Sequence, residues 1–100
     1  IDDATPEKLL SRYGRLPSIA FDCVGGETTA QLLRLLADGG HLVSYGAISG
    51  QPLSIPTEQL IFARKRLSGF WVSRWFREAP IDKVRGMMDR LCKFHADGIL

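Results

Sequence analysis

Two short apolar runs end abruptly at glycine, and they hold the residues best suited to binding chemistry. The first is residues 18–26, SIAFDCVGG, and the second is residues 39–50, GGHLVSYGAISG. Because glycine lacks a Cβ and tolerates positive φ, such turns let a ligand approach the main chain. An apolar strand followed by a glycine turn is typical of the carboxyl edge of a parallel α/β sheet, where ligands bind. The two runs therefore predict a binding edge built mainly from peptide groups.

The residues after the second run are the first candidates for ligand contact. Tyr45, Gly46, Ala47 and Ile48 follow the apolar strand directly. Their main-chain groups suit a flat ring that carries a carboxamide. A tyrosine on the rim of a core strand explains the pattern equally well, so the residues alone leave both interpretations open.

A third apolar run ends in aromatic residues. Phe70 and Trp71 close this run, and Trp75 and Phe76 follow within a few residues. Four large aromatic side chains would be costly to leave exposed. Core packing or a subunit contact is the structural alternative to ligand binding, and it is favoured for Trp75 and Phe76.

The histidines and cysteines do not form a catalytic or metal site by spacing. His41 and His95 have no carboxylate or cysteine partner at ligand spacing, and Cys23 and Cys92 lack a CxxC pattern. Both cysteines are expected to be reduced core residues. The sequence therefore predicts no catalytic acid, base or nucleophile and no metal site.

Two charged features remain open. Asp22 is the only acid inside an apolar run, and it would bond a neighbouring turn or, less favoured, lie near a ribose. The basic triplet Arg64, Lys65 and Arg66 suits phosphate or RNA, but a solvated turn before a strand is favoured. A G-x-G-x-x-G fingerprint is absent, so these residues alone would not hold a dinucleotide in the usual manner.

Helices and strands are expected to alternate along the chain. We expect helices over residues 7–13, 27–37, 58–62 and from Pro80 through Phe94. Strands are expected over residues 19–24, 41–45 and 67–72. Asp3 or Thr5 would cap the first helix, Gly14 would end it, and Thr57 would cap the third. Short connections after helices predict an α/β fold with three parallel strands flanked by helices.

Length and composition exclude several classes of protein. One hundred residues, 45% of them hydrophobic and 24% charged, fit one small globular domain or part of a larger one. The net charge of +2 is too small to indicate a nucleic-acid or membrane partner, and no apolar run is long enough to span a membrane. The chain starts without methionine and ends without a helix cap, so residues 1–100 are expected to be a fragment of a longer chain.

Four segments resemble the medium-chain dehydrogenase/reductase superfamily, in particular its zinc-independent 2-enoyl thioester reductases. The segments are residues 21–26, FDCVGG; 32–40, LLRLLADGG; 43–46, VSYG; and 67–75, LSGFWVSRW. The last segment is the most specific, and the resemblance covers nearly the whole chain. It implies that residues 1–100 are the second half of an NADPH-binding Rossmann domain.

The resemblance also implies which residues would contact the cofactor. They are Tyr45, Gly46, Ala47 and Ile48 after the second strand and Phe70, Trp71 and Val72 at the end of the third; Cys23 to Gly25 would lie near the same pocket. It implies a homodimer formed through the edge strand Leu67 to Val72. The proton-donating tyrosine of the family and its phosphate-binding glycine loop would lie outside this chain.

The function implied by the resemblance is reduction of the C2=C3 double bond of a 2-enoyl thioester with NADPH, in fatty acid metabolism. The parent enzyme would be mitochondrial in a eukaryote and cytoplasmic in a bacterium, and the fragment alone would be inactive. An NADPH-dependent quinone or alkenal oxidoreductase is the alternative enzyme. A non-catalytic oligomerisation module is the alternative of another class.

Overall fold

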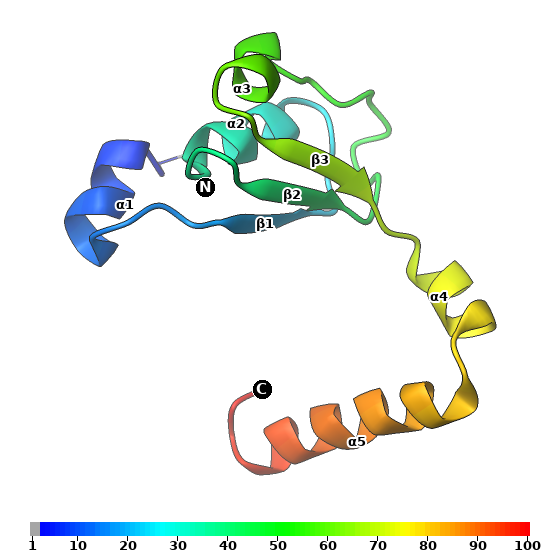
Figure 1. Cartoon of the computed structure of the whole chain (residues 1–100). Helices are drawn as coiled ribbons and strands as arrows, with labels where there is room; N and C mark the ends of the chain where they lie inside the picture. The colour runs from blue at the N-terminus through cyan, green and yellow to red at the C-terminus, as the bar shows by residue number, and fades with distance from the viewer. Residues whose placement is uncertain (1–2) are drawn as a thin grey trace. The chain divides into compact units, whose positions relative to one another are not determined.

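Three parallel strands form one sheet in the computed structural model, which describes residues 3–100 (Figure 1). The strands are β1 (Ile19–Asp22), β2 (His41–Ser44) and β3 (Arg66–Gly69), in the order β1-β2-β3. Asp22 pairs with Ser44, and Ser44 pairs with Gly69, so the three strands end together. The predicted α/β fold with three parallel strands flanked by helices is confirmed.

The chain divides into two units, and the sheet belongs to the first, which ends at Phe70. Its helices are α1 (Pro6–Tyr13), α2 (Glu27–Leu35) and α3 (Thr57–Ile61). Thr5 caps α1, because its hydroxyl accepts the N–H of Lys8 at 3.1 Å, and Gly14 ends the helix at a φ of 76°. Thr57 is the first residue of α3 and not its cap, which is Pro56.

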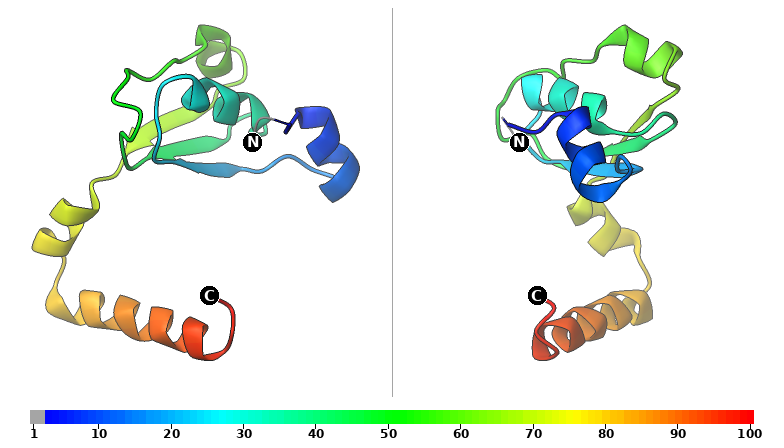
Figure 2. Two further views of the ribbon diagram at one scale, coloured as in Figure 1. Left: turned by 180° about the vertical axis from the view of Figure 1, so that it is seen from behind. Right: turned by 90° about the vertical axis from the view of Figure 1, so that its left-hand side faces the viewer.

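The core of this unit lies between α2 and one face of the sheet (Figure 2). Leu33 of α2 and Leu36, the residue that ends this helix, pack against Leu42 of β2. All three side chains are fully buried. Successive residues of a strand point to opposite faces. Ala20 of β1 packs against the core, while Phe21 is 63% exposed. Within the first unit, α2 therefore covers one face of the sheet.

The strands are shorter than predicted, because the parallel pairing ends at Asp22, Ser44 and Gly69. β1 ends at Asp22, whose carboxylate begins a turn, and β2 ends at Ser44. The last ladder bond of β3 runs from Phe70 N–H to the Ser44 carbonyl at 2.9 Å. The prediction that the third strand extends to Val72 is therefore wrong.

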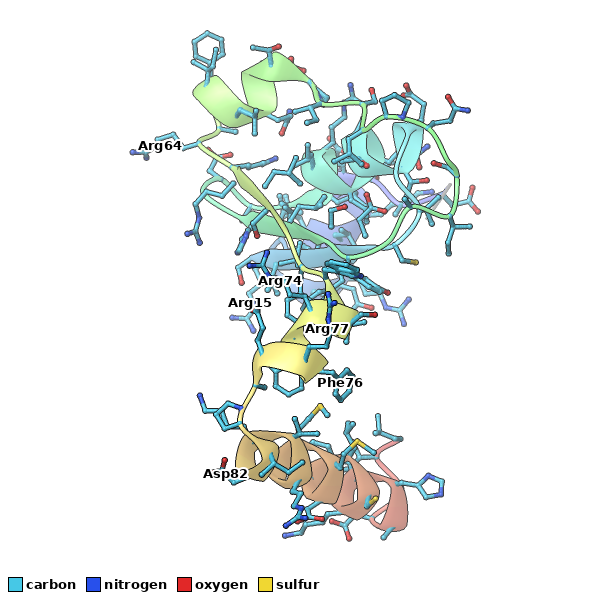
Figure 3. The ribbon with its side chains drawn as sticks, turned by 90° about the vertical axis from the view of Figure 1, so that its right-hand side faces the viewer. Arg15, Arg64, Arg74, Phe76, Arg77 and Asp82 are labelled. Carbon is cyan, nitrogen blue, oxygen red and sulfur yellow. The ribbon has the colours of Figure 1, made fainter. Side chains whose placement is uncertain are left out.

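The second unit runs from Trp71 to Leu100 and contains two helices, α4 (Val72–Glu78) and α5 (Ile81–Ala96). The sequence did not predict α4. Arg74 and Glu78, which are one turn apart in this helix, form an ion pair at 2.9 Å. The helix ends at Glu78, before Pro80. Figure 3 shows Arg74 and Arg77 projecting from α4. Among residues 3–100, no helix has the length and apolar character needed to cross a lipid bilayer.

Candidate functional site

The ends of the three strands bring Tyr45 and Phe70 to the same edge of the sheet. Tyr45 N–H donates to the Asp22 carbonyl and Phe70 N–H donates to the Ser44 carbonyl, each at 2.9 Å. Each residue therefore begins the connection that follows its strand, next to the end of the neighbouring strand. The carboxyl edge expected from the sequence exists, and it carries the first residue of each predicted contact segment.

The loop after β2 is fastened to the turn after β1. Ile48 N–H donates to the Cys23 carbonyl at 3.1 Å, and Ser49 N–H donates to the Val24 carbonyl at 2.9 Å. Further along, Ser54 N–H donates to the Gly26 carbonyl at 3.1 Å. We name residues 45–49 the edge loop and residues 22–26 the edge turn. The edge turn therefore fixes where the main chain of the edge loop lies.

Gly46 allows this close approach. A Cβ added at Gly46 would lie 3.0 Å from the Cys23 carbonyl oxygen and 3.2 Å from the Cys23 Cβ. Gly46 and Ala47 are exposed, and their N–H groups donate to no backbone carbonyl in the described part of the chain. Ile48 is also exposed, at 78%. The edge loop thus presents free peptide donors to solvent, as a binding platform for a carboxamide requires.

Tyr45 stands beside Cys23 at the start of the edge loop. The Cys23 thiol, through a hydrogen bond and its charge when ionised, raises the pKa of the Tyr45 phenol. A tyrosine phenol is already protonated at neutral pH, and the raised pKa leaves it so; the phenol can therefore donate a hydrogen bond. Tyr45 is 46% exposed, so a ligand can reach it.

The buried side chain of Asp22 holds the edge turn by hydrogen bonds to its main chain. Asp22 is 1% exposed, and its Oδ1 accepts the N–H groups of Val24 at 2.9 Å and Gly25 at 3.0 Å. Its Oδ2 accepts the Thr29 hydroxyl at 2.6 Å. Burial would raise the pKa of Asp22, but the hydrogen bonds from Thr29, Gly25 and Val24 outweigh it and lower the pKa. The carboxylate therefore bonds its neighbouring turn, the favoured interpretation, and its burial excludes a contact with a ribose.

The interpretation of the basic triplet as a solvated turn is wrong for Lys65. Lys65 is only 7% exposed, and its Nζ donates to the Leu33 carbonyl at 2.7 Å and to the side-chain oxygen of Gln59. It thus bonds a carbonyl in the last turn of α2, where a cation also suits the helix dipole. Arg64 and Arg66 are exposed, and Arg64 has a φ of 52°.

The remaining candidate side chains do not gather at the carboxyl edge. His41 bonds Ser68 across the strands at 2.6 Å. Cys92 is exposed and not a core residue, whereas Cys23 is half-buried. Within residues 3–100, no three His, Cys, Asp or Glu side chains are grouped as metal ligands.

Trp71 and Val72 belong to the second unit. Trp71 is 62% exposed, and the Arg77 guanidinium lies 5.0 Å from its ring centroid. A hollow of about 460 Å³ in this unit is lined by Trp75, Met87, Leu91 and Phe94 together with Lys83, Gly86 and Arg90. None of the predicted contact residues lines it. The sequence did not predict the contact of Arg77 with Trp71 or the bond between Asp22 and Thr29. The polar residue Thr29 in the first turn of the helix after Asp22 was the available signal for that bond.

The comparisons with known proteins identify the family. The model of the family described as zinc-binding dehydrogenase matches residues 2–92. The chain belongs to this family. The family's description names zinc, but the described residues group no three His, Cys, Asp or Glu side chains as ligands for it.

Curated relatives of this chain include mitochondrial enoyl-[acyl-carrier-protein] reductases. The protein of Dictyostelium discoideum is 40% identical over 75% of this chain and 21% of its own length. The protein of Mus musculus is 39% identical over 85% of this chain and 23% of its own length. These matches confirm the predicted resemblance to enoyl thioester reductases. The chain spans about a fifth of the length of these relatives.

Solved structures agree with the sequence relatives. The complex of Etr1p with NADP and crotonyl-CoA has a TM-score of 0.82 and 26% identity, and it covers 95% of this chain and 26% of its own. The mitochondrial 2-enoyl thioester reductase heterodimer of Candida tropicalis has a TM-score of 0.81 with the same identity and coverage. A putative NADPH:quinone reductase of Bacillus thuringiensis, at 21% identity and a TM-score of 0.76, shares the fold.

Proposed function

We propose that residues 1–100 are the second half of an NADPH-binding Rossmann domain in an enoyl thioester reductase. The single observation that supports this best is the carboxyl edge, where free peptide groups of the edge loop lie beside the ends of three parallel strands. Ligands of open parallel sheets bind at this edge. The likeness to a structure that holds NADP and crotonyl-CoA, over 95% of this chain, supports NADPH as the ligand that we propose for this edge.

The edge loop would hold the nicotinamide end of the cofactor. The N–H groups of Gly46 and Ala47 are free to donate to a carboxamide oxygen, and Tyr45 adds a phenol that stays protonated. Ile48 offers an exposed apolar side chain to a flat ring. These residues fit the group because they provide donors and apolar surface on a loop whose main chain is already fixed.

Phe70 would extend this surface from the end of β3. It begins the connection after β3 at the same edge as Tyr45, and its side chain is 44% exposed. In our proposal Phe70 shields the reacting ring from water, which favours hydride transfer over side reactions. A role for Trp71 and Val72 in cofactor binding stays a prediction of the family resemblance.

The parent enzyme would move one hydride and one proton. When bound, NADPH supplies a hydride to C3 of the 2-enoyl thioester, and C2 takes a proton, so that NADP⁺ and the saturated thioester leave. We assign no catalytic acid or base to residues 3–100. The role of this chain is to bind and orient the cofactor, while the proton donor would belong to the rest of the polypeptide.

Assembly and location follow the same proposal. β3 is an edge strand of the described sheet, with one side paired to β2. We propose that Arg66–Gly69 pairs with a second copy in a homodimer, which would also cover an edge that otherwise invites aggregation. The heterodimer of Candida tropicalis and the mitochondrial relatives support a dimer in the mitochondrion of a eukaryote.

Turnover by the complete protein tests the proposal. We expect saturable binding of NADPH and consumption of NADPH with crotonyl-CoA, and no such turnover from a purified copy of residues 1–100. Reduction of a quinone or an alkenal with no turnover of crotonyl-CoA would favour the alternative enzyme. A complete protein that assembles but binds no NADPH would overturn the proposal in favour of an oligomerisation module.

A further inference from the structure

We infer that Asp22, supported by Thr29, is a positioning residue for the cofactor platform: its buried carboxylate holds the edge turn that in turn holds the edge loop. The inference rests on the proposed function, because it assigns a role in cofactor affinity to a side chain that touches no cofactor. It starts from the one buried carboxylate among the described residues.

The first step is the shape of the edge turn. Both N–H groups that follow Cys23 point at Asp22 Oδ1, at 2.9 Å from Val24 and 3.0 Å from Gly25. Gly25 and Gly26 then take φ values of 84° and 59°, which only glycine adopts readily. The carboxylate therefore ends β1 and folds the chain back on itself within three residues.

The second step is the transmission of this shape to the edge loop. With the turn closed, the Cys23 and Val24 carbonyls accept the N–H groups of Ile48 and Ser49. These bonds flank the free N–H groups of Gly46 and Ala47 on their carboxyl side, and the bond from Tyr45 to Asp22 flanks them on the other. A loop held at both ends in its binding geometry loses little conformational entropy when a ligand binds.

The third step is the orientation of the carboxylate itself. Oδ2 accepts the Thr29 hydroxyl at 2.6 Å, and Thr29 is fully buried in the first turn of α2. The anion also lies by the amino terminus of α2, where the helix dipole favours negative charge. The hydrogen bonds that lower the pKa of Asp22 keep it ionised, so the anchor persists across the physiological range.

The structure offers a matched set of variants. In Asp22→Asn, the amide oxygen can accept the same two backbone N–H groups and the amide nitrogen can donate to Thr29, so the turn is retained. Asp22→Ala removes all three bonds, and Thr29→Val removes one while keeping its shape. Lys65→Met removes the other buried charge, at the opposite end of α2, and serves as the control for stability.

The experiment measures NADPH affinity and amide hydrogen exchange in the complete protein. We expect Asp22→Ala to weaken NADPH binding at least about tenfold and also to lower kcat at saturating NADPH, because a displaced edge loop binds the nicotinamide less tightly and orients it less well. Thr29→Val should weaken binding about threefold, and Asp22→Asn and Lys65→Met should stay within about twofold of the wild type. Exchange at the Ile48 and Ser49 amides of the free protein should rise in Asp22→Ala.

Each other outcome decides the inference. Unchanged exchange at Ile48 and Ser49 in Asp22→Ala overturns it, as does an affinity loss no larger than that of Lys65→Met. If Asp22→Ala fails to fold, Thr29→Val with unchanged affinity overturns it instead. A wild-type protein that binds no NADPH removes the proposed function, and the cofactor role of Asp22 with it, and is recognised before any variant is compared.

Discussion

The two ends of α2 each hold one buried charge, and the fold treats the two charges differently. Asp22 lies at the carboxyl edge of the sheet near the start of the helix, and Lys65 lies at the amino edge near its end. Both positions suit the helix dipole, an anion at the amino terminus and a cation at the carboxyl terminus. The pKa of each group is lowered, yet the causes are opposite.

For Asp22, burial raises the pKa, but hydrogen bonds to the carboxylate outweigh it, so the folded state favours the charged form. For Lys65, burial lowers the pKa and the Asp38 carboxylate only partly opposes it, so the folded state disfavours the charge. The carboxyl edge thus uses its charge to build a turn. The amino edge tolerates a charge that serves as a helix cap.

The largest expected effect comes from removing the Asp22 carboxylate. Asp22→Ala leaves the buried N–H groups of Val24 and Gly25 and the Thr29 hydroxyl without their acceptor, and should cost about 3 kcal/mol of unfolding free energy. Denaturant unfolding of the complete protein measures it. Asp22→Asn, which keeps an acceptor in place, is the control and should recover most of the loss.

Gly40 and Gly46, which lie on either side of β2, allow the two edges of the sheet to be compared by changes in the main chain. A Cβ at Gly40 would lie 2.8 Å from the Ala37 carbonyl oxygen and 2.9 Å from the Leu36 Cβ, so Gly40→Ala should cost about 2 kcal/mol of unfolding free energy. NADPH affinity should be unaffected. Gly46→Ala forces the edge loop away from Cys23 and should weaken NADPH binding about tenfold with a smaller loss of stability. Equal losses of NADPH affinity in Gly40→Ala and Gly46→Ala would contradict the proposal that the carboxyl edge, and not the amino edge, binds the cofactor.

The sequence predicted the parts of this arrangement that depend on local pattern. Apolar runs identified the three strands, and the glycines that end the first two runs indicated their common edge, because strand period and glycine conformations are properties of neighbouring residues. The cap at Thr5 and the stop at Gly14 were visible for the same reason.

The parts that were missed depend on partners distant in sequence. Lys65 became buried because the Leu33 carbonyl and Gln59, 32 and six residues away, meet its ammonium group, and nothing in a run of three basic residues reveals them. The third strand stops at Gly69 because β2 turns away at Tyr45, a limit set by the neighbouring strand. The side chain of Asp22 was open to two interpretations until the position of Thr29 was known.

Removing the charge at the amino edge should have a modest effect. Lys65→Met keeps the apolar stem and loses two hydrogen bonds, but it also removes a charge that burial disfavours, so the cost should be below about 1 kcal/mol. Thermal unfolding beside Asp22→Ala provides the measurement. A loss larger than that of Asp22→Ala would reverse the ranking of the two edges.

The smallest effect is the pH dependence that separates the two charges. Since the folded-state pKa of Asp22 is lowered, the stability that its charge contributes is fully present above the unfolded-state pKa and is lost as the pH falls through the folded value. The lowered pKa of Lys65 acts in alkaline solution, where the unfolded state binds more protons and stability rises with pH up to the unfolded-state pKa. The difference in unfolding free energy between the wild type and Asp22→Asn should therefore change with pH only in acid. The difference between the wild type and Lys65→Met should change with pH only in base. A difference for Lys65→Met that falls with rising pH would mean that the fold favours the lysine charge, and the contrast between the two edges would be lost.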